Sequence, residues 1–158
     1  ENTRQMLQAT KPLAVWTGGW RSASEFLSPR LWKRFVFPYY KQFVQVVVDE
    51  GVTPILHFDS DWTRDLEYFR EFPKGKSVLA LDGATDIFKA KEILGDHMCI
   101  MGDVPAALLS LGTPGEVDEY CQRLINEIGP SGFILSSGCD IPPNAKPENV
   151  KAMIDSVK

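Results

Sequence analysis

The sequence predicts an α/β chain that forms about five strand–helix units of a (β/α)8 barrel, also called a TIM barrel. Short apolar runs alternate with segments of helical spacing along the chain. Four of the apolar runs stop abruptly at groups that can transfer a proton or bind a metal ion. These runs are residues 55–59, 78–83, 98–103 and 134–139. Polar chemistry at the ends of buried strands is typical of the catalytic face of a barrel.

The first half of the chain alternates strand and helix patterns. We predict a strand at 11–17, a helical region at 28–51, a strand at 53–58 and a short helix at 61–72. Ser28 followed by Pro29 is a favourable helix start, because serine can cap the helix and proline suits its first turn. Pro38 has no backbone N–H and must break or kink the helical region, so we expect two helices there.

The second half continues this alternation. We predict strands at 77–81, 97–101 and 133–136, and helices at 85–94, 113–128 and 147–157. Gly95 should close the first of these helices, and Thr113 with Glu116 forms a capping box that opens the second. Strands as continuously apolar as these are covered on both faces, as in parallel α/β sheets.

Five units are fewer than the eight of a closed barrel, which needs roughly 250 residues, whereas this chain has 158. The first and fifth strands would be bare edges, which proteins rarely leave uncovered. We therefore expect residues 1–158 to be one domain, the C-terminal portion of a barrel, and the start at Glu1 without methionine suits an excised piece. A self-contained doubly wound sheet is the alternative, and open edges could also pair in a homodimer.

Composition excludes several classes of protein. The chain is 44% hydrophobic and 24% charged, as ordinary globular proteins are. A net charge of −4 and the absence of a Lys/Arg-rich run argue against nucleic acid as a partner. No apolar stretch approaches the roughly 20 residues of a membrane span, and no signal peptide opens the chain. Three cysteines without a close pair fit a reducing cytoplasm.

Three side chains form a candidate metal site. His57 and Asp59 point the same way because strand side chains alternate, and Cys139 ends another strand. Together they offer the nitrogen, oxygen and sulfur ligands that suit zinc with one position open. An isolated His-x-Asp pair is more often structural or incidental, and an unpaired cysteine is usually a small buried hydrophobe.

Other polar and aromatic residues are candidates for catalysis or substrate binding. Asp82 and Asp103 stand at strand ends as candidate catalytic groups, although aspartate beside glycine more often caps a turn. Arg21 could clamp an anionic substrate or be plain surface. Trp16, Trp20 and Trp62 could wall a pocket or merely fill one, and we take Trp20 and Trp62 as candidate substrate contacts. His97, Cys99 and Cys121 are interpreted as structural.

Several stretches resemble the uroporphyrinogen decarboxylase superfamily, which also contains corrinoid-dependent methyltransferases. They are residues 26–35, 38–41, 55–59, 81–86, 101–105, 112–117, 132–139 and 147–150. The resemblance runs in order from about residue 13 to the end of the chain and implies a TIM barrel, of which this chain covers the C-terminal half or so.

Two positions separate the branches of that superfamily. Decarboxylases resembling this chain carry histidine where Cys139 stands, whereas methyltransferases have Gly-Cys there and an upstream His-x-Cys. In the methyltransferases these three side chains hold zinc. This chain keeps His57 and Cys139 but has Asp59 in place of the middle cysteine, a harder ligand that zinc also accepts.

The resemblance implies metal-dependent methyl transfer between a corrinoid (cobalamin), carried by a partner protein, and a small-molecule methyl donor or thiol acceptor. Asp82 and Asp103 would then touch the substrate or support the ligands. A tetrapyrrole decarboxylase, which depends on positive groups rather than a metal, is the first alternative. A non-catalytic corrinoid- or tetrapyrrole-binding protein is the second.

Overall fold

The strands form one parallel sheet in the order in which they follow one another along the chain. The computed structural model describes residues 2–19 and 21–158. The strands are β1 (Ala14–Gly18), β2 (Thr53–Phe58), β3 (Val78–Leu81), β4 (Cys99–Val104) and β5 (Phe133–Ser137). Each pairs in parallel with the next, so β1 and β5 are the edges. Strand order never reverses as it does in a doubly wound sheet, so the barrel prediction is confirmed and that alternative is wrong.

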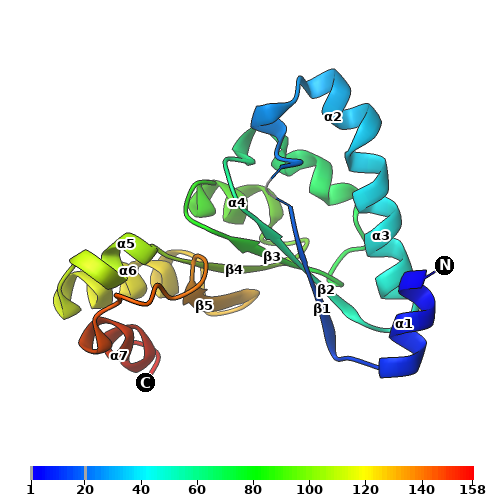
Figure 1. The fold of residues 1–158 in the computed structure, drawn as a ribbon. Helices are drawn as coiled ribbons and strands as arrows, with labels where there is room; N and C mark the ends of the chain where they lie inside the picture. The colour runs from blue at the N-terminus through cyan, green and yellow to red at the C-terminus, as the bar shows by residue number, and fades with distance from the viewer. Residues whose placement is uncertain (1, 20) are drawn as a thin grey trace.

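Helices connect the strands and lie along one side of the curved sheet (Figure 1). They are α1 (Asn2–Thr10), α2 (Pro29–Phe35), α3 (Phe37–Asp49), α4 (Ile87–Leu94), α5 (Ala106–Leu111), α6 (Pro114–Glu127) and α7 (Pro147–Asp155), with 3-10 helices η1 (Ser24–Phe26) and η2 (Thr63–Glu71). The structure is therefore a partial α/β barrel. None of the helices it describes is long and apolar enough to cross a membrane.

The predicted helix boundaries follow from local capping. The Ser28 side chain accepts a hydrogen bond from the N–H of Leu31, and α2 ends before Pro38, which occupies the first turn of α3. Thr113 and Glu116 form the predicted capping box at the start of α6. The prediction of two helices around Pro38 is therefore confirmed.

Some boundaries differ from the sequence prediction. The region 61–72 forms the 3-10 helix η2 rather than an α-helix, and α1 and α5 were not predicted. Strand β4 begins at Cys99 because the N–H groups of His97 and Met98 still bond to the carbonyl of Leu94. The strand continues to Val104, which pairs with Ser137 of β5, so Asp103 lies inside β4 instead of following it.

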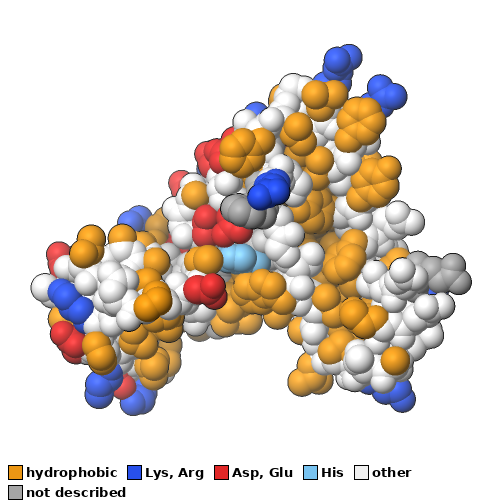
Figure 2. Space-filling view, viewed as in Figure 1, with side chains coloured by type: hydrophobic (Ala, Val, Ile, Leu, Met, Phe, Trp, Pro, Cys, Tyr) orange, Lys and Arg blue, Asp and Glu red, His pale blue; other side chains and the backbone are white. Residues whose placement is uncertain are grey.

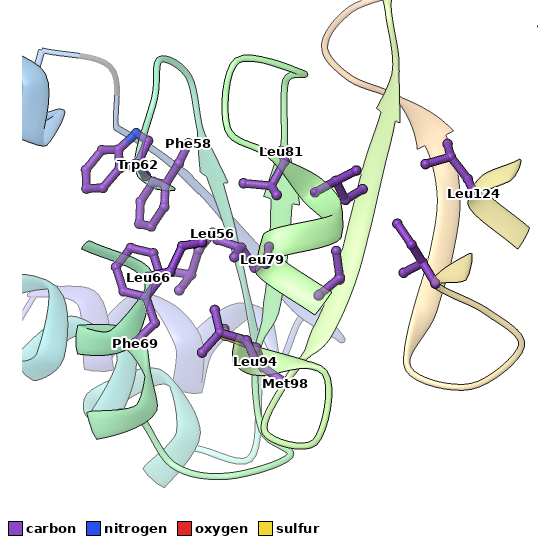
Figure 3. Close-up of a cluster of buried hydrophobic side chains, with 14 of the residues drawn as sticks. Leu56, Phe58, Trp62, Leu66, Phe69, Leu79, Leu81, Leu94, Met98 and Leu124 are labelled. Carbon is purple, nitrogen blue, oxygen red and sulfur yellow. The ribbon is translucent and has the colours of Figure 1, made fainter. Parts of the chain in front are cut away.

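The main core lies between the sheet and the helices. Leu56 and Phe58 of β2 and Leu79 of β3 are fully buried there against Leu66 and Phe69 of η2, as Figure 3 shows. Because side chains alternate along a strand, His57, between Leu56 and Phe58, faces the opposite side of the sheet. Packing of the core therefore fixes the direction in which the candidate ligand points.

Candidate metal centre at the carboxyl ends of the strands

Two segments that are far apart in the sequence meet where the strands end. One ligand atom each from His57, Asp59 and Cys139 lies within 4.8 Å of the others. His57 Nε2 is 3.3 Å from Asp59 Oδ1. Strands β3 and β4 lie between β2 and β5, which would separate the two strands by roughly 14 Å in a flat sheet. The curvature of the sheet (Figure 1) and the loop after β5 bring Cys139 back toward β2.

Each of the three side chains is positioned differently. His57 lies on β2 and is only 9% exposed. The centre of its ring is 5.0 Å from that of Trp16 on the neighbouring strand. Asp59 follows β2 directly, with about a third of its side chain exposed. Cys139 is exposed, and its carbonyl accepts a hydrogen bond of 2.7 Å from the Ser137 hydroxyl, which stabilises the turn that presents the thiol.

The three residues line a cavity of about 450 Å³, which we call the strand-end cavity. Its lining consists of Trp16, His57, Asp59, Met101, residues 80–81 and residues 136–141. In the space-filling view, a histidine lies in the hollow of the molecule beside acidic and apolar side chains (Figure 2). The lining that this chain supplies contains two carboxylates, Asp59 and Asp140, and no lysine or arginine among the described residues.

The chemistry of the three donor atoms, nitrogen, oxygen and sulfur, suits a zinc ion. Zinc ligands at 2.0–2.3 Å in tetrahedral geometry are separated from one another by roughly 3.3–3.8 Å, and the His57–Asp59 distance of 3.3 Å agrees with this. Nδ1 of His57 is buried and has no hydrogen-bond partner among the residues that the structure describes. An unpartnered buried ring nitrogen is costly unless a ligand or water satisfies it. The candidate ligand atom is nevertheless Nε2, which lies beside Asp59, whereas Nδ1 points in a different direction and is open to a hydrogen bond.

The two aspartates predicted to be catalytic hold other parts of the structure. Asp82 accepts hydrogen bonds from the N–H groups of Ser60 and Ala84, at 3.0 and 2.8 Å. Asp103 is buried and accepts a 2.7 Å hydrogen bond from the Tyr120 hydroxyl of α6, and burial raises the pKa of its carboxyl. Neither residue lines the strand-end cavity. Asp82 thus bonds to loop residues and Asp103 to helix α6, and neither carboxylate points into the cavity.

The predicted substrate contacts lie elsewhere. Trp62 is fully buried among the aromatic rings of the core, so its prediction as a substrate contact is wrong. It packs there because the residues around it form an apolar cluster that only the folded chain assembles. Arg21 is exposed in the turn after β1 and does not line the strand-end cavity. Trp20 lies outside the described residues. Trp16 is the described tryptophan that does line the cavity.

The residues interpreted as structural have clear partners or burial. His97 Nε2 lies 2.9 Å from the carbonyl oxygen of Phe72, and Cys121 is fully buried on α6. Cys99 is half-buried in β4. Met101 and Asp140 line the cavity without having been predicted. The signal for Met101 was its place on β4, two residues from Cys99, on the face that alternation turns toward the cavity.

A parallel sheet in sequential order, with candidate ligands at its carboxyl edge, is the arrangement of a partial (β/α)8 barrel. The profile of the family described as uroporphyrinogen decarboxylase (URO-D) matches residues 8–158. The chain belongs to this family.

Individual relatives agree with this assignment. The chain is 30% identical to a uroporphyrinogen decarboxylase of Syntrophotalea carbinolica over 132 residues, which cover 83% of this chain and 37% of the relative. It is 30% identical to the uroporphyrinogen decarboxylase of Chlorobium luteolum over 144 residues, which cover 88% of this chain and 39% of that relative. A solved structure of a methyltransferase from Methanosarcina mazei superposes on this chain with a TM-score of 0.78 at 20% sequence identity. The superposition covers 97% of this chain and 43% of the methyltransferase. The chain therefore spans about two fifths of the length of these relatives.

Proposed function

We propose that the intact protein transfers methyl groups between a corrinoid carried by a partner protein and a small-molecule methyl donor or thiol acceptor. The observation that carries this proposal is the convergence of His57, Asp59 and Cys139 beneath one cavity. The Gly-Cys sequence at 138–139 resembles the methyltransferase branch of the superfamily. The fold likeness to a methyltransferase is compatible with the same activity.

The three side chains would hold a zinc ion, which when bound supplies Lewis acidity toward a thiol or a donor oxygen. His57 presents a nitrogen from a rigid strand, and the Trp16 ring packs against its imidazole. Cys139 presents sulfur from an exposed turn that a substrate can reach. Leu81 and Met101 contribute apolar groups to the lining of the cavity.

Decarboxylation of a tetrapyrrole is the second candidate, because the curated relatives carry that name. A substrate with several carboxylates requires cationic side chains to bind it. The described lining instead contributes Asp59 and Asp140, and no cation. These two carboxylates do not assist the binding of a substrate that carries several carboxylates.

Zinc analysis of the intact protein tests the proposal directly. We expect about one zinc ion per chain in the wild type, a large loss in Cys139→Ser, and no loss in Cys99→Ser, a matched control outside the cluster. Equal, negligible zinc in all three proteins would refute the metal site.

Turnover assays distinguish the three activities. Incubation with methylcobalamin and a thiol should yield the thioether and cob(I)alamin, which visible spectroscopy follows. Conversion of uroporphyrinogen without methyl transfer would support the decarboxylase. Corrinoid binding without turnover of any donor or acceptor would support a binding protein.

A further inference from the structure

The loop after β3 contacts both segments that carry the candidate ligands. Thr85, in this loop, is 1% exposed, and its hydroxyl makes two hydrogen bonds to the segment that follows β2. The hydroxyl donates to the carbonyl of Ser60 at 3.0 Å and accepts from the N–H of Trp62 at 2.9 Å. One buried hydroxyl therefore spans the turn directly after Asp59.

Two further contacts fix the same turn. The indole N–H of Trp62 donates to the carbonyl of Asp59 at 2.7 Å, and the carboxylate of Asp82 accepts from the N–H of Ser60 at 3.0 Å. Ser60 has a φ of +75°, a conformation that non-glycine residues seldom adopt without support. The turn after Asp59 is thus held by Thr85, Asp82 and Trp62 together.

The loop after β3 also determines where Cys139 lies. The carbonyl oxygen of Asp82 is so close to Gly138 that a Cβ at this position would lie 2.6 Å from it. The N–H of Gly138 bonds to the carbonyl of Val104 at 2.9 Å. The turn that presents Cys139 is therefore seated directly on the backbone of Asp82.

We propose that residues 82–85 position the metal ligands, with Thr85 and Asp82 holding Asp59 and the Asp82 backbone seating Cys139. This proposal rests on the proposed metal site. Asp59 is at the end of a strand and partly exposed, so its carboxylate would otherwise sample many orientations. Groups that orient metal ligands typically change metal affinity by 10–100-fold when they are removed.

Thr85→Val in the intact protein tests this role, because valine keeps the shape and removes both hydrogen bonds. Thr85→Ser keeps the hydroxyl and serves as the rescue variant. Thr113→Val removes a helix cap at α6, away from the cavity, and controls for a general loss of stability. Zinc affinity is measured by competition with a chromogenic chelator, and the visible spectrum of the Co²⁺-loaded protein reports coordination by the thiolate and the other ligands.

We expect Thr85→Val to bind zinc about 10–100-fold more weakly and to alter the Co²⁺ spectrum. Thr85→Ser and Thr113→Val should stay close to the wild type. If Thr85→Val does not fold, Asp82→Asn, which removes the charge and one acceptor, should show the same change to a smaller degree.

The outcomes separate the two proposals. If Thr85→Val keeps the zinc affinity and Co²⁺ spectrum of the wild type, the positioning role is overturned and the metal site stands. Asp82→Asn takes the place of Thr85→Val in this comparison if Thr85→Val does not fold. Equal weakening in Thr113→Val would also overturn it, because loss of stability would then explain the change. A wild type that binds no zinc would overturn the metal site and the positioning role together.

Discussion

Adding one methyl group at Gly138 should displace the candidate ligand Cys139. An alanine Cβ would lie 2.6 Å from the carbonyl oxygen of Asp82, 2.9 Å from its carbonyl carbon and 3.2 Å from its Cα. All three are backbone atoms, which cannot rotate away as a flexible side chain could. Restoring an ordinary contact of 3.4 Å requires the two backbone segments to move apart by about 0.8 Å. Such a shift is costly because protein interiors are closely packed.

We expect two measurable consequences of Gly138→Ala. Overpacking should lower the free energy of unfolding by about 1–3 kcal/mol. Metal sites tolerate only about ±0.2 Å in ligand distance, so the zinc affinity should fall by at least about tenfold. Urea unfolding and chelator competition on the intact protein measure the two effects.

Gly115→Ala is the matched control for this change. Gly115 lies in the first turn of α6, and no atom approaches within 4 Å of an added Cβ. Alanine should therefore leave zinc binding unchanged and stabilise the helix by up to about 1 kcal/mol. If Gly138→Ala binds zinc as tightly as Gly115→Ala does, the close seating of Cys139 on β3 has no functional consequence and the reasoning fails.

Further changes test the aspartate, the core and the cavity wall. Burial raises the pKa of Asp103, so the stability that it contributes is present at low pH and is lost as pH rises through the folded-state pKa. Asp103→Asn can still accept the Tyr120 hydrogen bond but does not ionise. The melting temperature of Asp103→Asn minus that of the wild type should therefore increase from about pH 4 to pH 7. A difference that stays constant over this range would contradict the prediction. Leu79→Ala removes a fully buried side chain at the centre of the sheet and should cost about 2–5 kcal/mol in urea unfolding; a loss below 1 kcal/mol would show that the site collapses around the change. Trp16→Leu should raise KM for the small substrate several-fold while zinc content stays that of the wild type, and loss of zinc would instead mean that the Trp16 ring is needed to hold His57 in place.

Much of the fold could be predicted because its signals are local. The boundaries of β2 at 53–58 follow from a short, mostly apolar run, and the capping box at Thr113 depends on residues three apart. The break at Pro38 follows from the missing N–H of proline. By contrast, α1 and α5 are short helices of nine and six residues, and η2 has a helical pattern whose hydrogen bonding is of the 3-10 type.

The candidate site was predictable only in part. Alternation on β2 was enough to turn His57 away from the core and toward the strand ends. The roles of Trp62 and Asp103 were not, because an indole or a carboxylate near a strand end can face either the cavity or the helices. Long-range packing decides between these directions, and it places Trp62 in the core and Asp103 against Tyr120.

The sequence by itself determined the class of fold, the family and the identity of the three candidate ligands, since these depend on patterns and motifs that are read along one stretch of chain. Only the tertiary structure decided that β2 and β5, separated by two strands, bring His57 and Cys139 within bridging distance. It also shows that Thr85 and Asp82 bond to the turn after Asp59 and that the Asp82 backbone lies against Gly138. The physical reason is that curvature of the sheet and contacts between distant loops arise from packing of the whole domain, which no local run of residues specifies.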